Sequence, residues 1–478
     1  MERILYLPIE TIARELDAKL LLAHRALFRG YSVIIGHKSN VFKAAKQLGY
    51  GIYFSKDHDI ESSPILRISN DYGLIRTALD EEGLTFIDDK FYLDRAKPQK
   101  LEHLKIVFTW GSYQRNLLVK ENPSLETKVV AVGNPRFDLL RPEFKPFYES
   151  AREKIKKTWG SYFLINTRFQ AGNFSRNYGC NYLEYQENSS IKNRGRSLLE
   201  EERYFFLERG KYYKKKFDQY SEMLTMLSLR YPDLNFILRP HPSEDHENWK
   251  EALKGLKNVH VIFEGSAIDW INGALAVIHT GCTTGIESWA LQKPVIIYNP
   301  DPNDIYETAL PNKFGVGVTN VDELYGVLEN IIAGKFQDTF EKQSEVAFPF
   351  IESIKGKLSA ERIMDALDNL PDIPTDVFDG TGKSIQKKLK DMESKKRAIK
   401  FQIIKWLLKY HLIIRKFAGK RAHNFIIDKF KNQFQKFPGL STKSVYEKLL
   451  IFDLIFPNKH TNNYSVKRIA TDTYLIDK

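Results

Sequence analysis

The clearest pattern of apolar and polar positions lies between residues 234 and 300. Short apolar runs at 235–238, 259–263, 276–280 and 295–298 alternate with segments of helical spacing. Runs of this length, bounded by Gly, Pro and polar residues, predict βαβ units and a parallel sheet. Ligands of such sheets bind beyond the carboxyl ends of the strands, so the polar residues that follow each run are the first candidates for a site.

The N-terminal part repeats this alternation. Its apolar runs predict strands at 3–9, 31–36, 51–54, 105–111 and 128–133. Residues 11–28 carry apolar side chains at helical spacing, and Gly30 ends that helix. We expect residues 74–79 to be helical and residues 180–196 to form a polar loop before a long helix at 198–231. The chain is thus predicted to be α/β, with two Rossmann-like domains.

Changes in composition place the domain boundaries. The first Rossmann-like domain is expected at 1–142 and the second at 160–370, closed by helices at 321–334 and 358–369. A linker rich in Pro and Gly follows, and residues 383–478 are expected to form a basic, amphipathic, helical C-terminal region.

The turn after the third apolar run points to an anion. Its sequence, Gly-Cys-Thr-Thr-Gly at 281–285, opens a predicted helix. Small residues there let backbone N–H groups approach a phosphate, and the helix dipole favours negative charge. Gly281 begins this turn, and the hydroxyls of Thr280, Thr283 and Thr284 would add donors. The structural alternative is that a Thr only caps the helix.

Two neighbouring positions extend the predicted phosphate site. His241 is held between Pro240 and Pro242 after the first of these strands, and Arg239 precedes it. We expect both to donate to the phosphate and Glu287 to accept hydrogen bonds from ribose hydroxyls. Alone, His241 would be an ordinary turn residue. The occurrence of such residues at successive strand ends favours nucleotide binding.

Adjacent carboxylates mark a second candidate site in the first domain. Glu81 and Glu82 lie in an Asp-Glu-Glu-Gly sequence at 80–83. Neighbouring negative charges repel, so one carboxyl can hold a raised pKa suited to a general base. The alternative is a solvated turn. Further polar residues expected at the cleft between the domains are Glu10, Arg14, Asn134, Arg136, Asn166, Arg168, Glu264 and Ser266.

Composition narrows the class of protein. The two cysteines, Cys180 and Cys282, imply no disulfide framework and fit a reducing cytoplasm. No Cys and His pattern of a metal site is present, so no metal is expected. Of the basic residues, 17 Lys or Arg lie within 383–436, against 3 Asp or Glu. This argues against nucleic acid as a partner and favours an anionic membrane surface that meets this segment. The alternative is a helix packed on the protein body.

Taken in order, these motifs resemble a known family. Residues 5–16, the acidic motif at 80–83, Gly-Asn-Pro-Arg at 133–136, Asn-Thr-Arg at 166–168 and the Arg-Pro-His-Pro motif at 239–242 are similar to those of bacterial surface carbohydrate biosynthesis proteins. That group is similar to the GT-B glycosyltransferases that use CMP-Kdo. The resemblance covers about residues 3–370. The sequence departs from the related sialyltransferases in having Thr-Gly-Cys-Thr-Thr where they have paired serines.

The resemblance implies a GT-B-like enzyme, with two Rossmann-type domains facing a cleft. It would transfer a CMP-activated Kdo or sialic-like sugar onto a surface polysaccharide or glycolipid, without metal or other cofactor. Glu81 or Glu82 would be the catalytic base, and His241 with Thr280, Thr283 and Thr284 would hold the CMP phosphate. Such a protein would be cytoplasmic and peripheral on the inner membrane. The alternatives are a UDP-sugar transferase or 2-epimerase, a CDP-glycerol-type polyol-phosphate transferase, or a non-catalytic scaffold of polysaccharide assembly.

Overall fold

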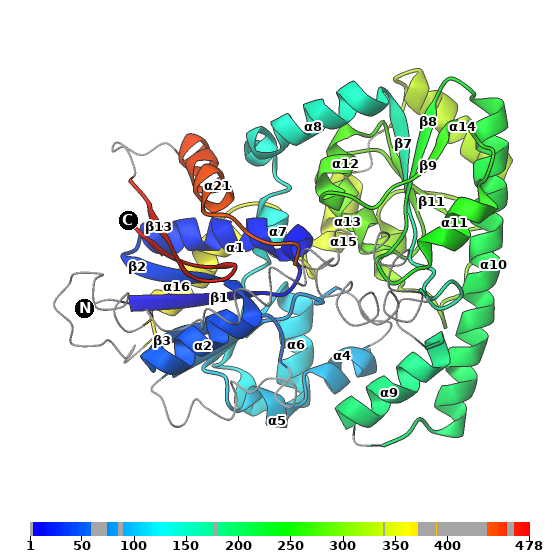
Figure 1. The fold of residues 1–478 in the computed structure, drawn as a ribbon. Helices are drawn as coiled ribbons and strands as arrows, with labels where there is room; N and C mark the ends of the chain where they lie inside the picture. Colours follow the sequence, from blue (N-terminus) through cyan, green and yellow to red (C-terminus); the bar gives the residue numbers. More distant parts are fainter. Residues whose placement is uncertain are drawn as a thin grey trace, which may run out of the picture. The chain divides into compact units, whose positions relative to one another are not determined.

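The computed structural model describes most of the chain and divides it into two compact units (Figure 1). The described residues are 3–58, 74–84, 89–175, 180–194, 196–337, 340–370, 389, 437–456 and 463–478. The first unit comprises Met1–Gly83, Asp88–Phe147 and Phe348–Lys478, and the second comprises Leu84–Ile87 and Tyr148–Ala347.

The first unit contains an eight-stranded sheet in the order β13-β14-β2-β1-β3-β4-β5-β6. Its pairs from β2 to β6 are parallel, whereas β14 pairs antiparallel with β13 and β2. The strands are β1 (Arg3–Ile9), β2 (Tyr31–His37), β3 (Gly51–Ser55), β4 (Leu74–Leu79), β5 (Ile106–Thr109), β6 (Val129–Ala131), β13 (Ser465–Ala470) and β14 (Thr473–Asp477).

Helices cover this sheet because each carries one apolar face. In α1 (Ile12–Leu27), the residues at helical spacing, Leu16, Leu20 and Ala23, are buried. Helices α1 and α2 (Lys38–Leu48) lie on opposite faces of the sheet (Figure 1), as right-handed crossovers in opposite directions require. The other helices are α4 (Asp89–Arg95), α5 (Pro98–Leu101), α6 (Ser112–Glu121), η1 (Pro123–Leu125), α7 (Pro135–Asp138), η2 (Pro142–Phe144), α16 (Ser359–Asp368) and α21 (Thr442–Ile455).

The second unit contains a six-stranded sheet in the order β12-β11-β10-β7-β8-β9, parallel throughout. The strands are β7 (Tyr162–Asn166), β8 (Asn235–Arg239), β9 (Val259–Val261), β10 (Val277–His279), β11 (Val295–Tyr298) and β12 (Val316–Val318). The helices are α8 (Lys145–Trp159), α9 (Tyr182–Arg194), α10 (Glu200–Arg230), α11 (His246–Ala252), α12 (Ala267–Gly273), α13 (Thr283–Ala290), η4 (Leu310–Lys313), α14 (Val321–Ile332) and α15 (Phe340–Ala347). The predicted α/β class, with two Rossmann-type units in one chain, is confirmed.

Two predicted elements are wrong. Leu74–Leu79 is not helical but forms strand β4, paired with β3 and β5. A run of six residues is too short for its periodicity to separate a helix from a strand, and only the neighbouring strands decide between them. Residues 182–194, expected in a polar loop, form helix α9, which packs along α10.

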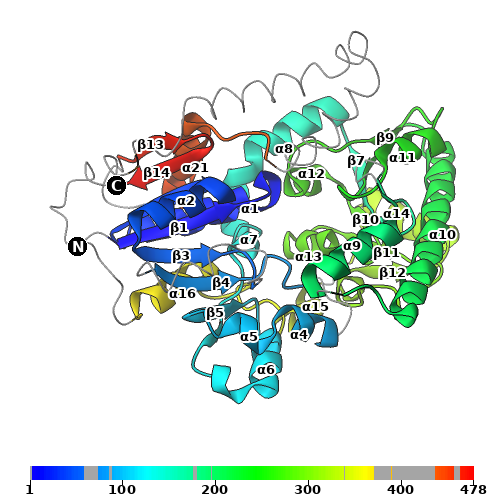
Figure 2. The ribbon, with the colours of Figure 1, turned by 60° about the horizontal axis from the view of Figure 1, so that its bottom comes forward.

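The C-terminal residues belong to the first unit (Figure 2). Strand β14 pairs with β2, and α21 packs on α1, so the described part of 383–478 is a helix and a hairpin rather than a helical region alone. Helix α16 also lies in the first unit rather than closing the second, because the buried Asp138 carboxylate accepts the N–H groups of Ser359 and Ala360 at its start, both at 2.8 Å.

The segment predicted to meet a membrane, 383–436, lies outside the described residues except for Leu389. Among the helices that the structure describes, none has both the length and the apolar character needed to span a membrane.

The burial of β14 predicts that the stability of the first unit depends on the C-terminal strand. Leu475 is fully buried in β14, whereas Leu454 on α21 is 78% exposed. We expect Leu475→Ala to lower the free energy of unfolding by about 2–5 kcal/mol, because it leaves a cavity in the core. The matched control, Leu454→Ala, should change it by less than about 0.5 kcal/mol. Urea denaturation measures both, and equal effects would show that β14 does not form part of the core.

Candidate functional site

The candidate site of the second unit lies at three adjacent strand ends. Strand β7 lies between β8 and β10, and its last residue, Asn166, is in register with Arg239 of β8 and His279 of β10. Parallel strands lie about 4.8 Å apart, so the three following loops share one edge of the sheet. The chain runs from β7 to β9 on one side and returns to β10 on the other. The ends of β7 and β10 therefore form a topological switch point, where α/β sheets bind ligands.

The turn after β10 combines a left-handed glycine with a buried hydroxyl. Gly281 has φ +60° and donates its N–H to Asn312 Oδ1 at 2.7 Å. Thr280 is 2% exposed, and within the described residues its hydroxyl has no hydrogen-bond partner. A buried hydroxyl without a partner is costly, which makes Thr280 Oγ1 a candidate ligand contact.

Some donors of the predicted phosphate turn form hydrogen bonds within the protein. The N–H of Gly281 goes to Asn312, and that of Gly285 goes to the Cys282 carbonyl at 2.9 Å. The Thr284 hydroxyl donates to Cys282 Sγ at 3.0 Å. Of the backbone N–H groups expected to face a phosphate, those of Gly281 and Gly285 are therefore already bound.

Gly285 allows helix α13 to pack on His279. A Cβ atom at Gly285 would lie 2.1 Å from Nε2 of the fully buried His279 imidazole. Glycine at this position therefore sets how closely α13 approaches β10. Burial also lowers the pKa of His279 to about 4, so the imidazole is neutral at physiological pH.

The loop after β7 brings an amide and a guanidinium to the same edge. Asn166 is 3% exposed, and its Nδ2 has no partner among the described residues. Arg168 donates to Thr308 Oγ1 at 3.0 Å. Burial raises the pKa of the Cys282 thiol, and Arg168 is near enough for its charge to oppose that rise. Arg168 therefore lies beside the start of α13.

His241 is held in one orientation. Its Nδ1 accepts the N–H of Ser243 at 3.1 Å, so in the neutral imidazole the proton is on Nε2. Its own backbone N–H donates to Glu244 Oε1 at 3.0 Å. These contacts set the tautomer and the orientation of the His241 imidazole at the carboxyl end of β8, and its contact with a phosphate stays a prediction.

Glu244, which the sequence did not single out, joins the loops after β7 and β8. Its fully buried carboxylate accepts hydrogen bonds from the Thr167 hydroxyl at 2.8 Å, the Trp249 indole at 2.8 Å, and the N–H groups of Phe169 and His241 at 3.1 and 3.0 Å. Burial raises its pKa, which these four donors oppose. An acidic residue in a Pro-rich loop is typical of the surface, so only the fold reveals this role.

Other predicted residues have contacts that hold the loops. The Arg239 guanidinium donates to the carbonyls of Glu264 and Gly265 at 2.6 and 3.2 Å, and it is 7% exposed. It therefore fixes the turn after β9 instead of presenting its charge to a phosphate. Ser266 accepts the N–H of Ile268 at 3.3 Å and caps α12. Glu264 is exposed, and Glu287 is buried on α13.

In the first unit the predicted acidic residues form ion pairs with lysine and arginine side chains. Glu81, which is 5% exposed, pairs with Lys19 Nζ at 3.3 Å through Oε1, and within the described residues its Oε2 has no hydrogen-bond partner. Glu82 pairs with Arg14. The Asp80 carboxylate accepts the Glu82 N–H at 2.9 Å and two bonds from Arg95 at 2.6 and 2.8 Å, which fixes the turn.

The remaining first-unit predictions lie around this turn. Glu10 pairs with Lys56 and Lys38 at 2.8 and 3.0 Å; burial opposes ionisation, but the two lysines hold its pKa well below the usual range. Asn134 Oδ1 accepts the Arg136 N–H at 2.9 Å and caps α7. Arg136 lies over the Trp110 ring and reaches the Glu81 carbonyl at 3.5 Å.

Glu15 was not predicted as a site residue. It is fully buried and accepts the N–H groups of Glu10 and Thr11 at 3.0 and 3.2 Å. Burial and the neighbouring Glu81 raise its pKa. Its place in the first turn of α1, next to Arg14, was the one signal that the sequence offered.

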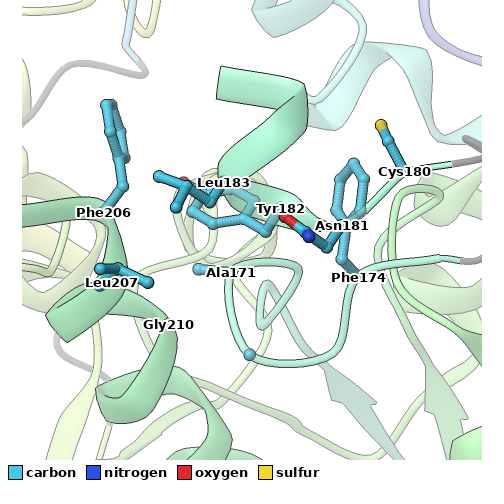
Figure 3. Close-up of a pocket in the computed structure, with 10 residues that line it drawn as sticks. Ala171, Phe174, Cys180, Asn181, Tyr182, Leu183, Phe206, Leu207 and Gly210 are labelled. Carbon is cyan, nitrogen blue, oxygen red and sulfur yellow. The ribbon is translucent and has the colours of Figure 1, made fainter. Parts of the chain in front are cut away.

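A hollow of about 690 Å³ lies elsewhere on the second unit (Figure 3). It is lined by the loop after β7 and by α9 and α10, with Phe174, Tyr182, Leu183, Phe206 and Leu207 among its residues. None of the predicted site residues lines it, so the site predicted from the sequence and this apolar hollow are distinct.

No protein-family profile and no curated protein sequence matches this chain. Solved structures do resemble it. They include the UDP-GlcNAc 2-epimerase of Methanocaldococcus jannaschii (14% identity over 77% of this chain and 99% of that one, TM-score 0.48). The UDP-GlcNAc 2-epimerase of Neisseria meningitidis bound to UDP-GlcNAc is also similar, with 12% identity over 77% of this chain and 100% of that one and a TM-score of 0.45. The wall teichoic acid polymerase TagF has 11% identity over 81% of this chain and 90% of that one, with a TM-score of 0.46. With TM-scores below 0.5, these likenesses carry no argument about the chemistry of this chain.

The packing of α13 on His279 predicts a size limit at Gly285. We expect Gly285→Ala to destabilise the second unit, because its methyl group would overlap the buried imidazole. Gly326 on α14 offers a matched control, since a Cβ there meets nothing within 4 Å. Gly326→Ala should be neutral or stabilising by up to about 1 kcal/mol, because alanine favours helices. Thermal denaturation compares the two, and a neutral Gly285→Ala would contradict the packing.

His279 also predicts a pH dependence. Its pKa is about 6.5 in the unfolded chain and about 4 in the folded one, so the unfolded state binds more protons between these values. The stabilising contribution of neutral His279 is complete above pH 6.5 and is lost as the pH falls to 4, by up to about 3 kcal/mol. In His279→Gln, the fall of the unfolding free energy between pH 7 and pH 4 should be smaller by that amount. Equal falls in both proteins would show that His279 is not buried as a neutral group.

Proposed function

We propose that the second unit binds the phosphate of a nucleotide-activated sugar and that the protein is a glycosyltransferase. The observation that carries this proposal is the Thr280 hydroxyl, which is buried at the switch point beside the start of α13 and has no partner in the part of the chain that the structure describes. The neighbouring Arg168 supplies positive charge. A helix start with a buried donor and a cation is the arrangement that favours a phosphate group.

These groups would act on the leaving nucleotide. As the bond from sugar to phosphate breaks, negative charge grows on the phosphate oxygens. The Thr280 hydroxyl, the N–H groups at the start of α13 other than that of Gly285, the His241 imidazole and the Arg168 guanidinium would stabilise that charge. Because the loops that carry them are held by buried carboxylates, little reorganisation is needed when the charge develops. Independence from metal stays a prediction.

A carboxylate of the first unit would act on the acceptor hydroxyl. In an inverting reaction it would remove the proton of the acceptor hydroxyl, and in a retaining reaction a second carboxylate would attack the sugar. Glu82 has a side chain that is 42% exposed, whereas Glu81 is 5% exposed and paired with Lys19. We therefore assign the contact with the acceptor to Glu82, and to Glu81 the role of setting the charge around it.

The identity of the nucleotide rests on the sequence motifs. The acidic-Gly and His-Pro motifs favour a CMP-activated Kdo or sialic-like sugar, with a surface glycan or glycolipid as acceptor. The phosphate turn would suit UDP- and CDP-linked substrates equally. The membrane surface as a partner of 383–436 is likewise proposed from charge alone.

Nucleotide binding is tested by the melting temperature. We expect CMP to raise it more than UDP or CDP, because a ligand of the folded state stabilises that state. Thr280→Val keeps the shape of the side chain and removes the hydroxyl, and should weaken CMP binding about tenfold. Thr225→Val is the control, since its hydroxyl donates to the Ser221 carbonyl within α10. If no nucleotide raises the melting temperature, the protein is not this enzyme, and a non-catalytic scaffold becomes the better hypothesis.

Catalysis is tested with a panel of CMP-sugars and release of CMP as the readout. We expect Glu82→Gln and His241→Ala each to lower kcat by about 10²-fold or more, since each removes a group that acts on the reacting atoms. Glu251→Gln, which changes a carboxylate that is 77% exposed on α11, is the matched control and should keep the activity. Normal CMP release by both variants would overturn these roles.

A further inference from the structure

A side chain of the loop between β11 and β12 holds the phosphate turn. Asn312, in η4, accepts the Gly281 N–H with its Oδ1 at 2.7 Å. Its Nδ2 donates to Glu307 Oε2 at 2.8 Å. A carboxylate can only accept and an N–H can only donate, so one orientation of the Asn312 amide satisfies both neighbours.

Glu307 is itself fixed. It is 5% exposed and accepts from Asn299 Nδ2 at 2.9 Å and from the Tyr212 hydroxyl. Lys216, which is fully buried, lies 3.6 Å from it and donates to Asn299. A carboxylate with this many buried partners has no alternative position, so Glu307 fixes the orientation of the Asn312 amide.

The same segment also contacts Arg168, the cation of the site. Thr308 follows Glu307 in sequence, and its hydroxyl accepts from Arg168 at 3.0 Å. Residues 307–312 thus contact both the turn after β10 and the loop after β7. The segment does not depend on Asn312 for its own position, because Leu310 and Phe314 are buried on either side and Glu307 is bound independently.

We propose that Asn312, oriented by Glu307, is a positioning residue that sets the affinity of the turn at Gly281 for a nucleotide phosphate. By binding the Gly281 N–H, it holds that residue in its left-handed conformation and so directs the Thr280 hydroxyl and the start of α13. The inference rests on the function proposed above. It adds the specific requirement that Asn312 increases the affinity for the phosphate group and leaves the affinity for the nucleoside unchanged.

The experiment compares CMP with cytidine. We expect Asn312→Ala to raise the Kd for CMP about tenfold and to leave that for cytidine within about twofold, as measured by calorimetry. Asn320→Ala is the matched control. Asn320 caps α14 by accepting the Glu323 N–H at 2.9 Å, so its loss should lower the melting temperature without changing the affinity for CMP. Should Asn312→Ala fail to fold, Asn312→Asp provides the second test. Its carboxylate would face that of Glu307, and because the two repel each other, its oxygen would move away from the Gly281 N–H. The same loss of affinity for CMP is therefore expected.

Hydrogen exchange of the Gly281 amide gives a readout without ligand. It should speed up about tenfold in Asn312→Ala and stay unchanged in Asn320→Ala, because only the first loses the acceptor. If the wild type binds CMP and Asn312→Ala binds it equally well, this inference is overturned while the proposed function stands. Equal weakening of CMP and cytidine would also overturn it, since the role would then be structural. If the wild type binds neither CMP, UDP nor CDP, the proposed function fails and this inference fails with it.

Discussion

Each loop at the candidate site of the second unit leaves the end of a buried parallel strand, so its backbone N–H groups have to find acceptors within the protein. Two buried carboxylates meet this constraint. Glu244 accepts from the loops after β7 and β8, and Glu307 fixes the amide that accepts from the turn after β10. The positions of His241, Arg168 and Gly281 all follow from these acceptors. A charged hydrogen bond of this kind is strong because the surroundings exclude water.

Close packing adds a second constraint. Gly285 lets α13 approach the His279 imidazole, and in the first unit Gly83 lies against the Trp110 indole, where a Cβ would come within 2.5 Å of the ring. Trp110 in turn donates to the Asp80 carbonyl at 2.6 Å. In each unit a glycine therefore sets where a polar turn sits above its sheet, which links the packing of the core to the placement of candidate chemistry.

The two candidate sites differ in how their charges are balanced. In the first unit nearly every carboxylate has a cation: Glu82 has Arg14, Glu81 has Lys19, and Glu10 has two lysines. In the second unit, Thr280 Oγ1 and Asn166 Nδ2 are among the buried groups that have no hydrogen-bond partner within the described residues, as are both ring nitrogens of His279. A hydroxyl and an amide that have no acceptor can donate to an anionic ligand.

The sequence by itself determined the α/β alternation, the two Rossmann-type units, and most of their parallel strands. It also determined the polar positions of Thr280, His241 and Arg168 that follow apolar runs. Hydrophobic periodicity and the polar residues after each apolar run are local, so they can be read without the fold. Short segments could not be assigned in this way: residues 74–79 and 182–194 needed their neighbours in space. The use of Arg239 to hold a turn, the acceptor roles of Glu244 and Asn312, and the pairing of β14 with β2 join residues far apart in the chain. Only the tertiary structure decides such contacts, because a polar side chain carries no local signal of which buried donor it will satisfy.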